Sequence, residues 1–132
     1  MYLRSNWFAR RVINPVARRT RLATTLAVRA RKTGDLQEIP VNVLVRDGVS
    51  YLVSVRGESQ WVRNLRAAGT CELRNGGRQH EVKAEELPAG ERGPVIAAYR
   101  KKWGYQVAPY FRKLPDAADH PVFRLHPLPS RA

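Results

Sequence analysis

The chain has 132 residues, 43% of them hydrophobic, and a formal net charge of +13 from 24 Lys or Arg against 11 Asp or Glu. This length suits one domain and excludes two of ordinary size, and no apolar run approaches the roughly eighteen residues that would span a bilayer. The charge would attract an anionic partner: nucleic acid, an anionic membrane surface or an acidic cofactor. Arginines interrupt the N-terminal region where a secretory signal would be apolar, and the single cysteine, Cys71, excludes an internal disulfide, so we expect a cytoplasmic protein.

The first 20 residues are expected to form a basic helical segment, distinct from the domain that follows over residues 21–132. Residues 1–34 contain nine Arg or Lys and no Asp or Glu, and Pro15 should break or kink the helix. Aromatic residues among these arginines would suit peripheral contact with the cytoplasmic face of an anionic membrane. The favoured alternative is a helix that packs apolar side chains on the domain and leaves its arginines in water, because the apolar residues spread over a wide arc.

From residue 22 onward, period-two alternation predicts six short strands, over 22–31, 39–46, 50–55, 70–74, 78–87 and 121–125. Tight turns at Asp47-Gly48 and Asn75-Gly76-Gly77 indicate hairpins. A helix closed by Gly69 follows the third strand, and a second helix over 91–103 follows the fifth. The aromatic-rich stretch 104–114 is left without an assigned element.

This order of elements decides the fold class. A doubly wound parallel sheet needs regular alternation of strands and helices, which six strands with two inserted helices do not provide. A mainly β (α+β) fold is the better solution, in which an antiparallel sheet closes into a split β-barrel. Closure also removes the exposed strand edges that a small open sheet would leave.

An anion-binding corner is indicated between the third strand and the first helix. The strand ends at Arg56-Gly57, and the helix that follows would point unpaired backbone N–H groups outward at its start. Arg63 and Arg66 add positive charge nearby, so a phosphate or carboxylate would be held by both effects. A helix with a solvated basic face explains the same residues equally well.

Other chemistries find little support in the sequence. Its three histidines, His80, His120 and His126, lack metal-ligand spacing, so no metal site is expected. Neither a P-loop nor a G-x-G-x-x-G fingerprint occurs. Cys71 lies in a predicted strand without an activating partner and is interpreted as a small core or sheet residue, and His120 is interpreted as structural.

Five ordered elements carry a family resemblance over about residues 22–125. They are A-R-K-T-G at 30–34, I-P-V at 39–41, D-G at 47–48, S-V-R-G-E-S-Q-W-V-R-N-L-R-A-A-G at 54–69 and D-H-P-V-F-R-L at 119–125. Their combination resembles the deazaflavin (F420)-dependent nitroreductase and quinone reductase family. The resemblance implies a split β-barrel of the FMN-binding type that binds coenzyme F420. It also implies hydride transfer from the reduced coenzyme to a quinone, nitro compound or other small-molecule acceptor.

The resemblance also implies where the cofactor would bind. A basic groove of Arg31, Lys32, Arg56 and Arg63 would hold the anionic tail, and Pro40, Val41 and Val43 with residues 53–55 would form an apolar floor for the ring. The residues expected to bind the cofactor are Arg31, Lys32, Thr33, Pro40, Val41, Ser54, Val55, Arg56, Gly57, Gln60, Trp61, Arg63 and Asn64. Trp61 has helical spacing with Leu65, so it can equally be a core residue.

The proton donor is expected to be Tyr105 or Tyr110. Two departures from the family pattern are visible: Ala30 replaces the first glycine of the usual hairpin, and residues 99–111 do not align cleanly with the family's aromatic helix. The acceptor therefore stays open at this point.

Alternatives from other classes follow from the same fold. A split barrel could be a non-catalytic binding protein for FMN, haem or lipid, with FMN the alternative cofactor. Nucleic-acid binding is disfavoured because the aromatic residues are not interleaved with basic ones in a recognition motif. Either a monomer or a homodimer is compatible with the sequence.

Overall fold

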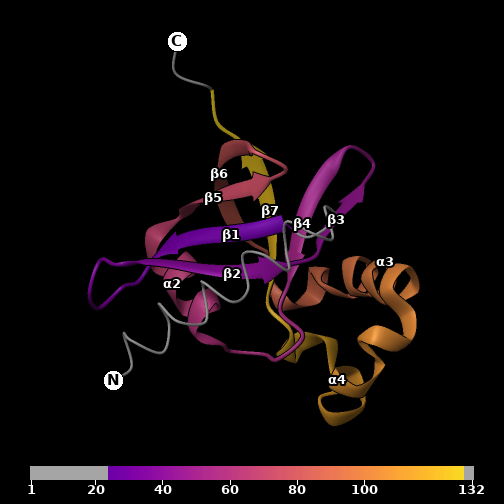
Figure 1. Cartoon of the computed structure of the whole chain (residues 1–132). Coiled ribbons are helices and arrows are strands. Elements are labelled where there is room, and N and C mark those ends of the chain that lie inside the picture. The colour runs from indigo at the N-terminus through magenta and orange to yellow at the C-terminus, as the bar shows by residue number, and fades with distance from the viewer. Residues whose placement is uncertain (1–23, 130–132) are drawn as a thin grey trace.

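The computed structural model describes residues 24–129, so the expected helical segment of residues 1–20 lies outside the described residues. Seven strands form one antiparallel sheet in the order β2-β1-β5-β6-β7-β4-β3 (Figure 1). The strands are β1 (Thr24–Arg29), β2 (Leu36–Val41), β3 (Val43–Arg46), β4 (Val49–Val53), β5 (Thr70–Asn75), β6 (Arg78–Glu86) and β7 (Val122–Pro127). The two ends of this order, β2 and β3, are separated in the chain by Asn42 alone. One bent stretch of chain therefore supplies both ends of the sheet, as the predicted split barrel requires.

The division at Asn42 corrects the strand predicted over 39–46. The part before Asn42 pairs with β1, with Thr24 opposite Val41, whereas the part after it pairs with β4, with Val43 opposite Leu52. Alternation over 39–46 indicates extended chain, but it carries no information about a change of pairing partner. Pro40 is compatible with this position because β2 is an edge strand that pairs only with β1. A proline has no backbone N–H to donate, so within a sheet it is confined to edge strands.

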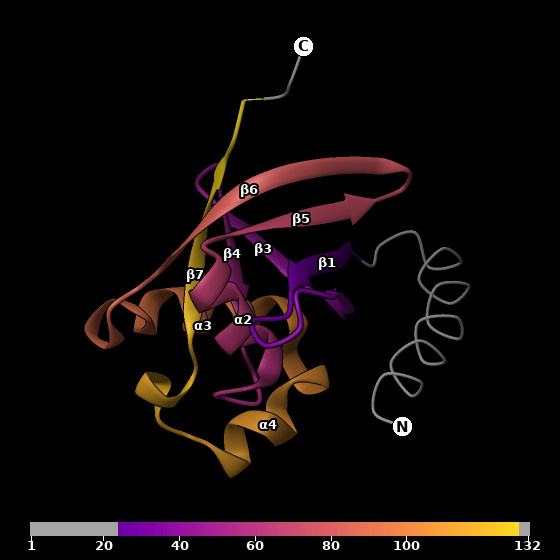
Figure 2. The ribbon, with the colours of Figure 1, turned by 90° about the vertical axis from the view of Figure 1, so that its left-hand side faces the viewer.

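Both predicted hairpin turns are confirmed. Asp47 and Gly48 have φ angles of 53° and 77° between the paired residues Arg46 and Val49. Positive φ at both central residues is the requirement of the two-residue turn that matches strand twist. The hairpin of β5 and β6 is turned by two glycines in the same way and projects from the rest of the sheet (Figure 2).

The first predicted helix is confirmed as α2 (Gln60–Ala68). It ends at Gly69, whose φ of 77° lets its N–H bond the carbonyl of Leu65. The second is α3 (Gly93–Trp103), which begins two residues later than predicted because a 3-10 turn over Ala89–Glu91 precedes it.

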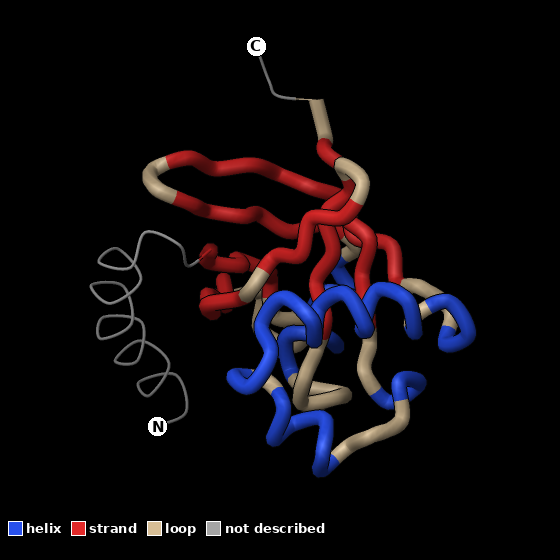
Figure 3. The backbone as a smooth tube through the Cα atoms, turned by 90° about the vertical axis from the view of Figure 1, so that its right-hand side faces the viewer, coloured by secondary structure: helices blue, strands red, loops and turns tan. Residues whose placement is uncertain are grey.

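The unassigned stretch 104–114 contains further helical structure. It forms a 3-10 turn, Gly104–Gln106, followed by α4 (Ala108–Lys113), and another 3-10 turn over Ala117–Asp119 leads into β7. The helices lie together on one side of the strands, away from the β5–β6 hairpin (Figure 3). No helix within residues 24–129 is long and apolar enough to cross a membrane.

Two apolar clusters stabilise this arrangement. One lies between the sheet and α2 and contains Leu26, Leu52, Val62, Leu65 and Phe123, each exposed by 1% or less. Cys71 belongs to this cluster, as predicted, and burial raises the pKa of its thiol to about 12. The second joins β3 and β4 to α3 and α4 through Leu44, Tyr51, Ile96, Tyr99 and Phe111. The space between the two packed regions holds the candidate site.

Candidate functional site

A cleft of about 650 Å3, here called the main cleft, lies where β2 turns into β3. The end of β4, the start of α2 and the α3–α4 region complete its walls. It is lined by Gln37, Ile39, Pro40, Val41, Asn42, Val53, Ser54, Val55, Arg56, Ser59, Gln60, Trp61, Tyr99, Gln106, Val107 and Tyr110. Eight of the residues predicted to bind cofactor or donate a proton are among them: Pro40, Val41, Ser54, Val55, Arg56, Gln60, Trp61 and Tyr110.

The floor of the main cleft is fixed by a tight turn after β4. Ser54 is buried, its N–H donates to Pro121 O at 2.9 Å, and its hydroxyl donates to Gly57 O at 2.6 Å. Gly57 has a φ of 80°, and a Cβ there would lie 3.2 Å from Leu114 Cδ2 and 3.3 Å from the carbonyl of Asp119. A side chain at Gly57 would therefore be strained by its backbone angle and crowded by its neighbours.

His120 braces this floor from beneath, a role beyond the general structural one predicted for it. Its side chain is fully buried, with Nδ1 2.9 Å from Ser54 O and Nε2 2.6 Å from Leu114 O. The imidazole ring also lies 4.4 Å from the ring of Phe111 in α4. One side chain thus connects the floor strand to the helix that carries Tyr110.

The start of α2 faces the main cleft and carries a side chain whose polar group has no partner among the described residues. Ser59 is the N-cap residue, yet its side chain makes no capping hydrogen bond, and no acidic residue occupies the first turn. The Ser59 hydroxyl oxygen is buried and has no hydrogen-bond partner among the described residues. A free hydroxyl beside the positive end of a helix dipole matches the needs of a phosphate or carboxylate oxygen. Ser59 was missed at the sequence level, although a serine directly before a predicted helix is a recognised cap signal.

The basic hairpin is attached to α2 at one end of the main cleft. Asn64, only 4% exposed, accepts from Arg31 N at 3.0 Å and from Arg31 Nη1 at 2.7 Å, and it donates to Gln37 Oε1 at 2.8 Å. Arg31 Nη1 also donates to Gln60 Oε1 at 3.0 Å. Since Gln37 and Gln60 line the cleft, this network connects the predicted residues Arg31, Gln60 and Asn64 to its wall.

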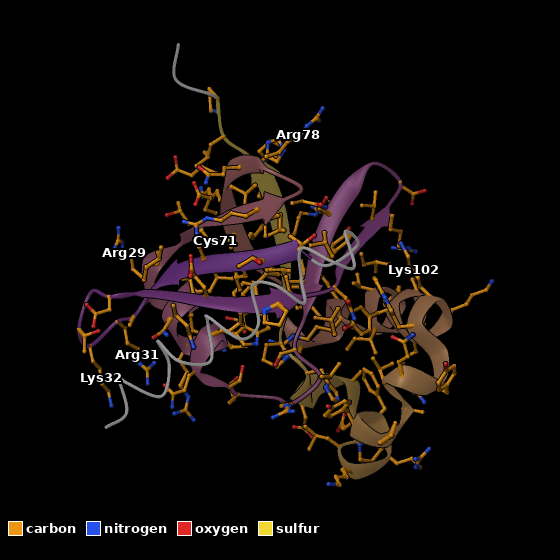
Figure 4. The ribbon with its side chains drawn as sticks, in the orientation of Figure 1. Arg29, Arg31, Lys32, Cys71, Arg78 and Lys102 are labelled. Carbon is orange, nitrogen blue, oxygen red and sulfur yellow. The ribbon has the colours of Figure 1, made fainter. Side chains whose placement is uncertain are left out.

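Three further predicted residues lie outside the main cleft. Lys32 and Thr33 are exposed in the β1–β2 turn, and Arg63 is exposed one helical turn beyond Gln60. Figure 4 shows Arg31 and Lys32 together at this turn, beside α2. Arg56 is at the rim, with its guanidinium carbon 5.5 Å from the ring centroid of Tyr110 and its Nη2 3.4 Å from the Tyr110 hydroxyl.

The two tyrosines proposed as proton donors are separated. Tyr110 lines the main cleft, whereas Tyr105 does not and is 85% exposed. Tyr105 lies on the surface, in the 3-10 turn after α3, so of the two predicted donors the structure places only Tyr110 at the main cleft. Val43, expected in the floor, is also outside the main cleft because the bend at Asn42 carries it to another face.

Asn42 and Gln106 are cleft residues that the sequence did not indicate. Asn42 Nδ2 lies 3.5 Å from the hydroxyl of Tyr99, at the limit of a hydrogen bond. Burial raises the pKa of Tyr99, and the contact with Asn42 acts in the opposite direction. An asparagine inside an apolar β run was the available signal for the bend.

The main cleft suits a flat ring with an anionic extension. Pro40, Val41 and Val53 give it apolar walls, and Trp61 contributes its half-buried ring while packing 6.1 Å from Phe123. Trp61 is thus both a cleft residue and a core residue. No group of three or more His, Cys, Asp or Glu side chains suitable for a metal ion occurs in residues 24–129.

The bent strand, the antiparallel sheet and the cleft between β2 and α2 define a split β-barrel protein. A family model described as F420H2-dependent quinone reductase matches residues 3–112, and the chain belongs to this family of oxidoreductases. The resemblance stated from the sequence is therefore confirmed. A comparison with curated proteins found no match.

Several solved structures share the fold. An F420-H2 dependent reductase, FDR-A, aligns with a TM-score of 0.55 at 18% identity over 80% of this chain and 95% of its own. A protein of unknown function from Agrobacterium tumefaciens aligns with a TM-score of 0.61 at 17% identity over 84% of this chain, which spans 52% of that protein. The haem storage protein HutZ of Vibrio cholerae aligns with a TM-score of 0.59 at 14% identity over 88% of both chains.

Proposed function

We propose that this protein is an F420H2-dependent reductase of a quinone or a similar unsaturated small molecule. The observation that carries the proposal is the main cleft, in which an apolar floor lies beside a helix start with an unpaired buried hydroxyl. Family membership supports dependence on F420, and the nature of the acceptor is our inference.

The proposed ring site consists of Pro40, Val41 and the segment from Val53 to Val55. These residues would exclude water from one face of a planar ring. Ser59 and the first N–H groups of α2 would hold an anionic oxygen. Arg31, Lys32 and Arg63 would then hold the anionic tail beyond this point.

When bound, the reduced deazaflavin supplies a hydride, and a quinone that accepts the hydride and one proton becomes the quinol. The chain's own contribution is positioning and one hydrogen-bond donor. We assign that donor to Tyr110, whose hydroxyl lies at the cleft beside Arg56. A donor placed before the reaction stabilises charge that develops on the acceptor oxygen.

Titration of coenzyme into the protein, followed by the coenzyme's own fluorescence, tests cofactor binding. Saturable binding with oxidation of reduced coenzyme on addition of menadione is expected. Binding without turnover of any quinone or nitro compound would reduce the protein to a cofactor carrier. A Soret band, or tight FMN binding without deazaflavin affinity, would replace the cofactor assignment altogether.

A charge reversal at Lys32 tests the tail site. Lys32→Glu should weaken the tailed coenzyme by about tenfold or more, since each lost charge-assisted contact is worth about 1.5 to 3 kcal/mol. Lys113→Glu, an exposed change in α4, is the matched control. Added salt should weaken tail binding because exposed charges are screened over about 8 to 10 Å. Equal losses for a truncated deazaflavin without phosphate and glutamates would show that Lys32 does not contact the tail.

A further inference from the structure

A second groove of about 1020 Å3 adjoins the main cleft. Its lining residues are Thr24, Asn42, Val43, Val45, Leu73, Asn75, Gly76, Arg78, His80, Lys102, Trp103 and Gln106. Asn42 and Gln106 line both spaces, one from the bend between β2 and β3 and the other from the turn after α3. A molecule placed over the floor of the main cleft can therefore extend past these two residues into the second groove.

The second groove has an apolar wall that is open to solvent. Val45 is 58% exposed, which makes it one of two large hydrophobic residues in the described part of the chain with such exposure. Trp103 lines the same groove, and its ring centroid lies 4.6 Å from that of Tyr99, a residue of the main cleft, with the two ring planes tilted by 41°. An apolar chain lying along this wall would remove the Val45 side chain from water, which is favourable in proportion to the area covered.

The charge of the second groove is entirely positive. Arg78 and Lys102 line it, together with His80, and no acidic residue is among its lining residues. Figure 4 shows Arg78 on the β5–β6 hairpin and Lys102 on α3, both far from Arg31 and Lys32 at the β1–β2 turn. These two cations are thus separate from the proposed tail site, and their field would attract an anionic group placed in the second groove.

We infer that the second groove binds the substituent of the electron acceptor, an apolar chain that ends in a carboxylate. The inference rests on the proposed function, because it extends the acceptor from the main cleft. The chain's own N-terminal segment is a poor occupant by charge, since residues 1–23 carry six arginines and no acidic residue. Acceptors with such a substituent bind more tightly than the bare ring. Neutral or cationic substituents lose the part of the binding free energy that comes from attraction to Arg78 and Lys102.

Three naphthoquinones with one ring system test this: menadione, a derivative with an apolar chain ending in a carboxylate, and the methyl ester of that derivative. The wild-type protein should bind the carboxylate about tenfold more tightly than the ester, a ratio that two partly exposed charge contacts can supply. Arg78→Glu combined with Lys102→Glu should remove this preference or reverse it. Lys101→Glu, a neighbouring exposed position of α3 outside the lining, is the matched control and should retain the preference.

Affinity is measured by calorimetry in parallel with KM, so that the two hypotheses fail separately. Absence of turnover with all three naphthoquinones and with nitro compounds would overturn the proposed reductase activity. Equal calorimetric affinity for carboxylate and ester in the wild type, or an unchanged preference in the double variant, would overturn the second groove as an acceptor site. Val45→Ser should weaken the carboxylate and the ester equally, and no change in either would contradict the apolar part of the inference.

Discussion

The two ends of the main cleft are held very differently. At the hairpin end, Asn64 and Gln60 fix Arg31 through hydrogen bonds of 2.7 to 3.0 Å, and Asn64 is buried. At the opposite end, Arg56 reaches Tyr110 at 3.4 Å and Asn42 reaches Tyr99 at 3.5 Å. The first set are ordinary hydrogen bonds, whereas the second set are at the limit of one.

This difference separates a preorganised end from an adaptable one. A network in which buried groups satisfy one another loses stability when a single member is removed. The contact between Arg56 and Tyr110 is exposed, so it can break without leaving a buried group unpaired. We therefore expect changes at the hairpin end to affect folding as well as binding, and changes at the Tyr110 end to affect turnover alone.

The largest expected effect is the loss of Asn64. Asn64→Ala leaves the Arg31 N–H and Gln37 without their partner, so the free energy of unfolding should fall by about 2 to 4 kcal/mol. Urea denaturation measures this loss. Arg63→Ala, an exposed change on the same helix, should stay within about 0.5 kcal/mol of the wild type. A loss below about 1 kcal/mol in Asn64→Ala would contradict a preorganised hairpin end.

An intermediate effect is expected at Tyr110. Tyr110→Phe should lower kcat about ten- to a hundredfold, because the donor to the acceptor oxygen is lost, while coenzyme affinity and stability stay nearly unchanged. Steady-state kinetics with menadione and coenzyme titration separate these quantities. Tyr105→Phe serves as the control because Tyr105 is 85% exposed and should show wild-type kinetics. Identical rates for both variants would remove Tyr110 from the proposed mechanism.

The smallest effect concerns an exposed ion pair outside the main cleft. Its loss of unfolding free energy can be compared with the loss expected for the buried Asn64 network. The hydrogen bond from Arg66 holds the pKa of Glu58 below its usual value, and both side chains are about half exposed. Because the folded-state pKa is lowered, this contribution to stability is present above pH 4.5 and is lost as the pH falls through the lowered pKa. Glu58→Gln, which leaves the Arg66–Glu86 ion pair in place, should therefore cost about 0.5 to 1 kcal/mol at pH 7 and less at pH 3, measured by urea denaturation. An equal cost at both pH values would exclude the Glu58 contribution.

Local signals predicted much of the fold. Asp47-Gly48 fixed one hairpin because its positive φ angles suit few other residues, and Gly69 marked the end of α2 for the same reason. The apolar floor at Pro40, Val41 and Val55 was also found, since its residues lie close together in the chain or in the resembling motifs.

Features set by long-range pairing were not predicted. The change of partner at Asn42 depends on β1 and β4, which are distant from each other in the sheet, and it moved Val43 from the main cleft to the second groove. Tyr105 and Tyr110 are five residues apart in the same aromatic-rich stretch of the sequence. The 3-10 turn before α4 decides which of them faces the main cleft. No periodic pattern in the sequence predicts that turn.

The single residue between β2 and β3 also limits where insertions and deletions can occur in this protein. Val41 pairs with Thr24 and Val43 pairs with Leu52, so only Asn42 separates two pairing registers. Insertion of one residue within 36–46 would turn the side chains of one strand to the opposite face of the sheet. Deletion would have the same result. The cleft can therefore acquire new specificity by substitution along this stretch, whereas insertions are tolerated at hairpin tips such as Gly76-Gly77, whose residues are exposed.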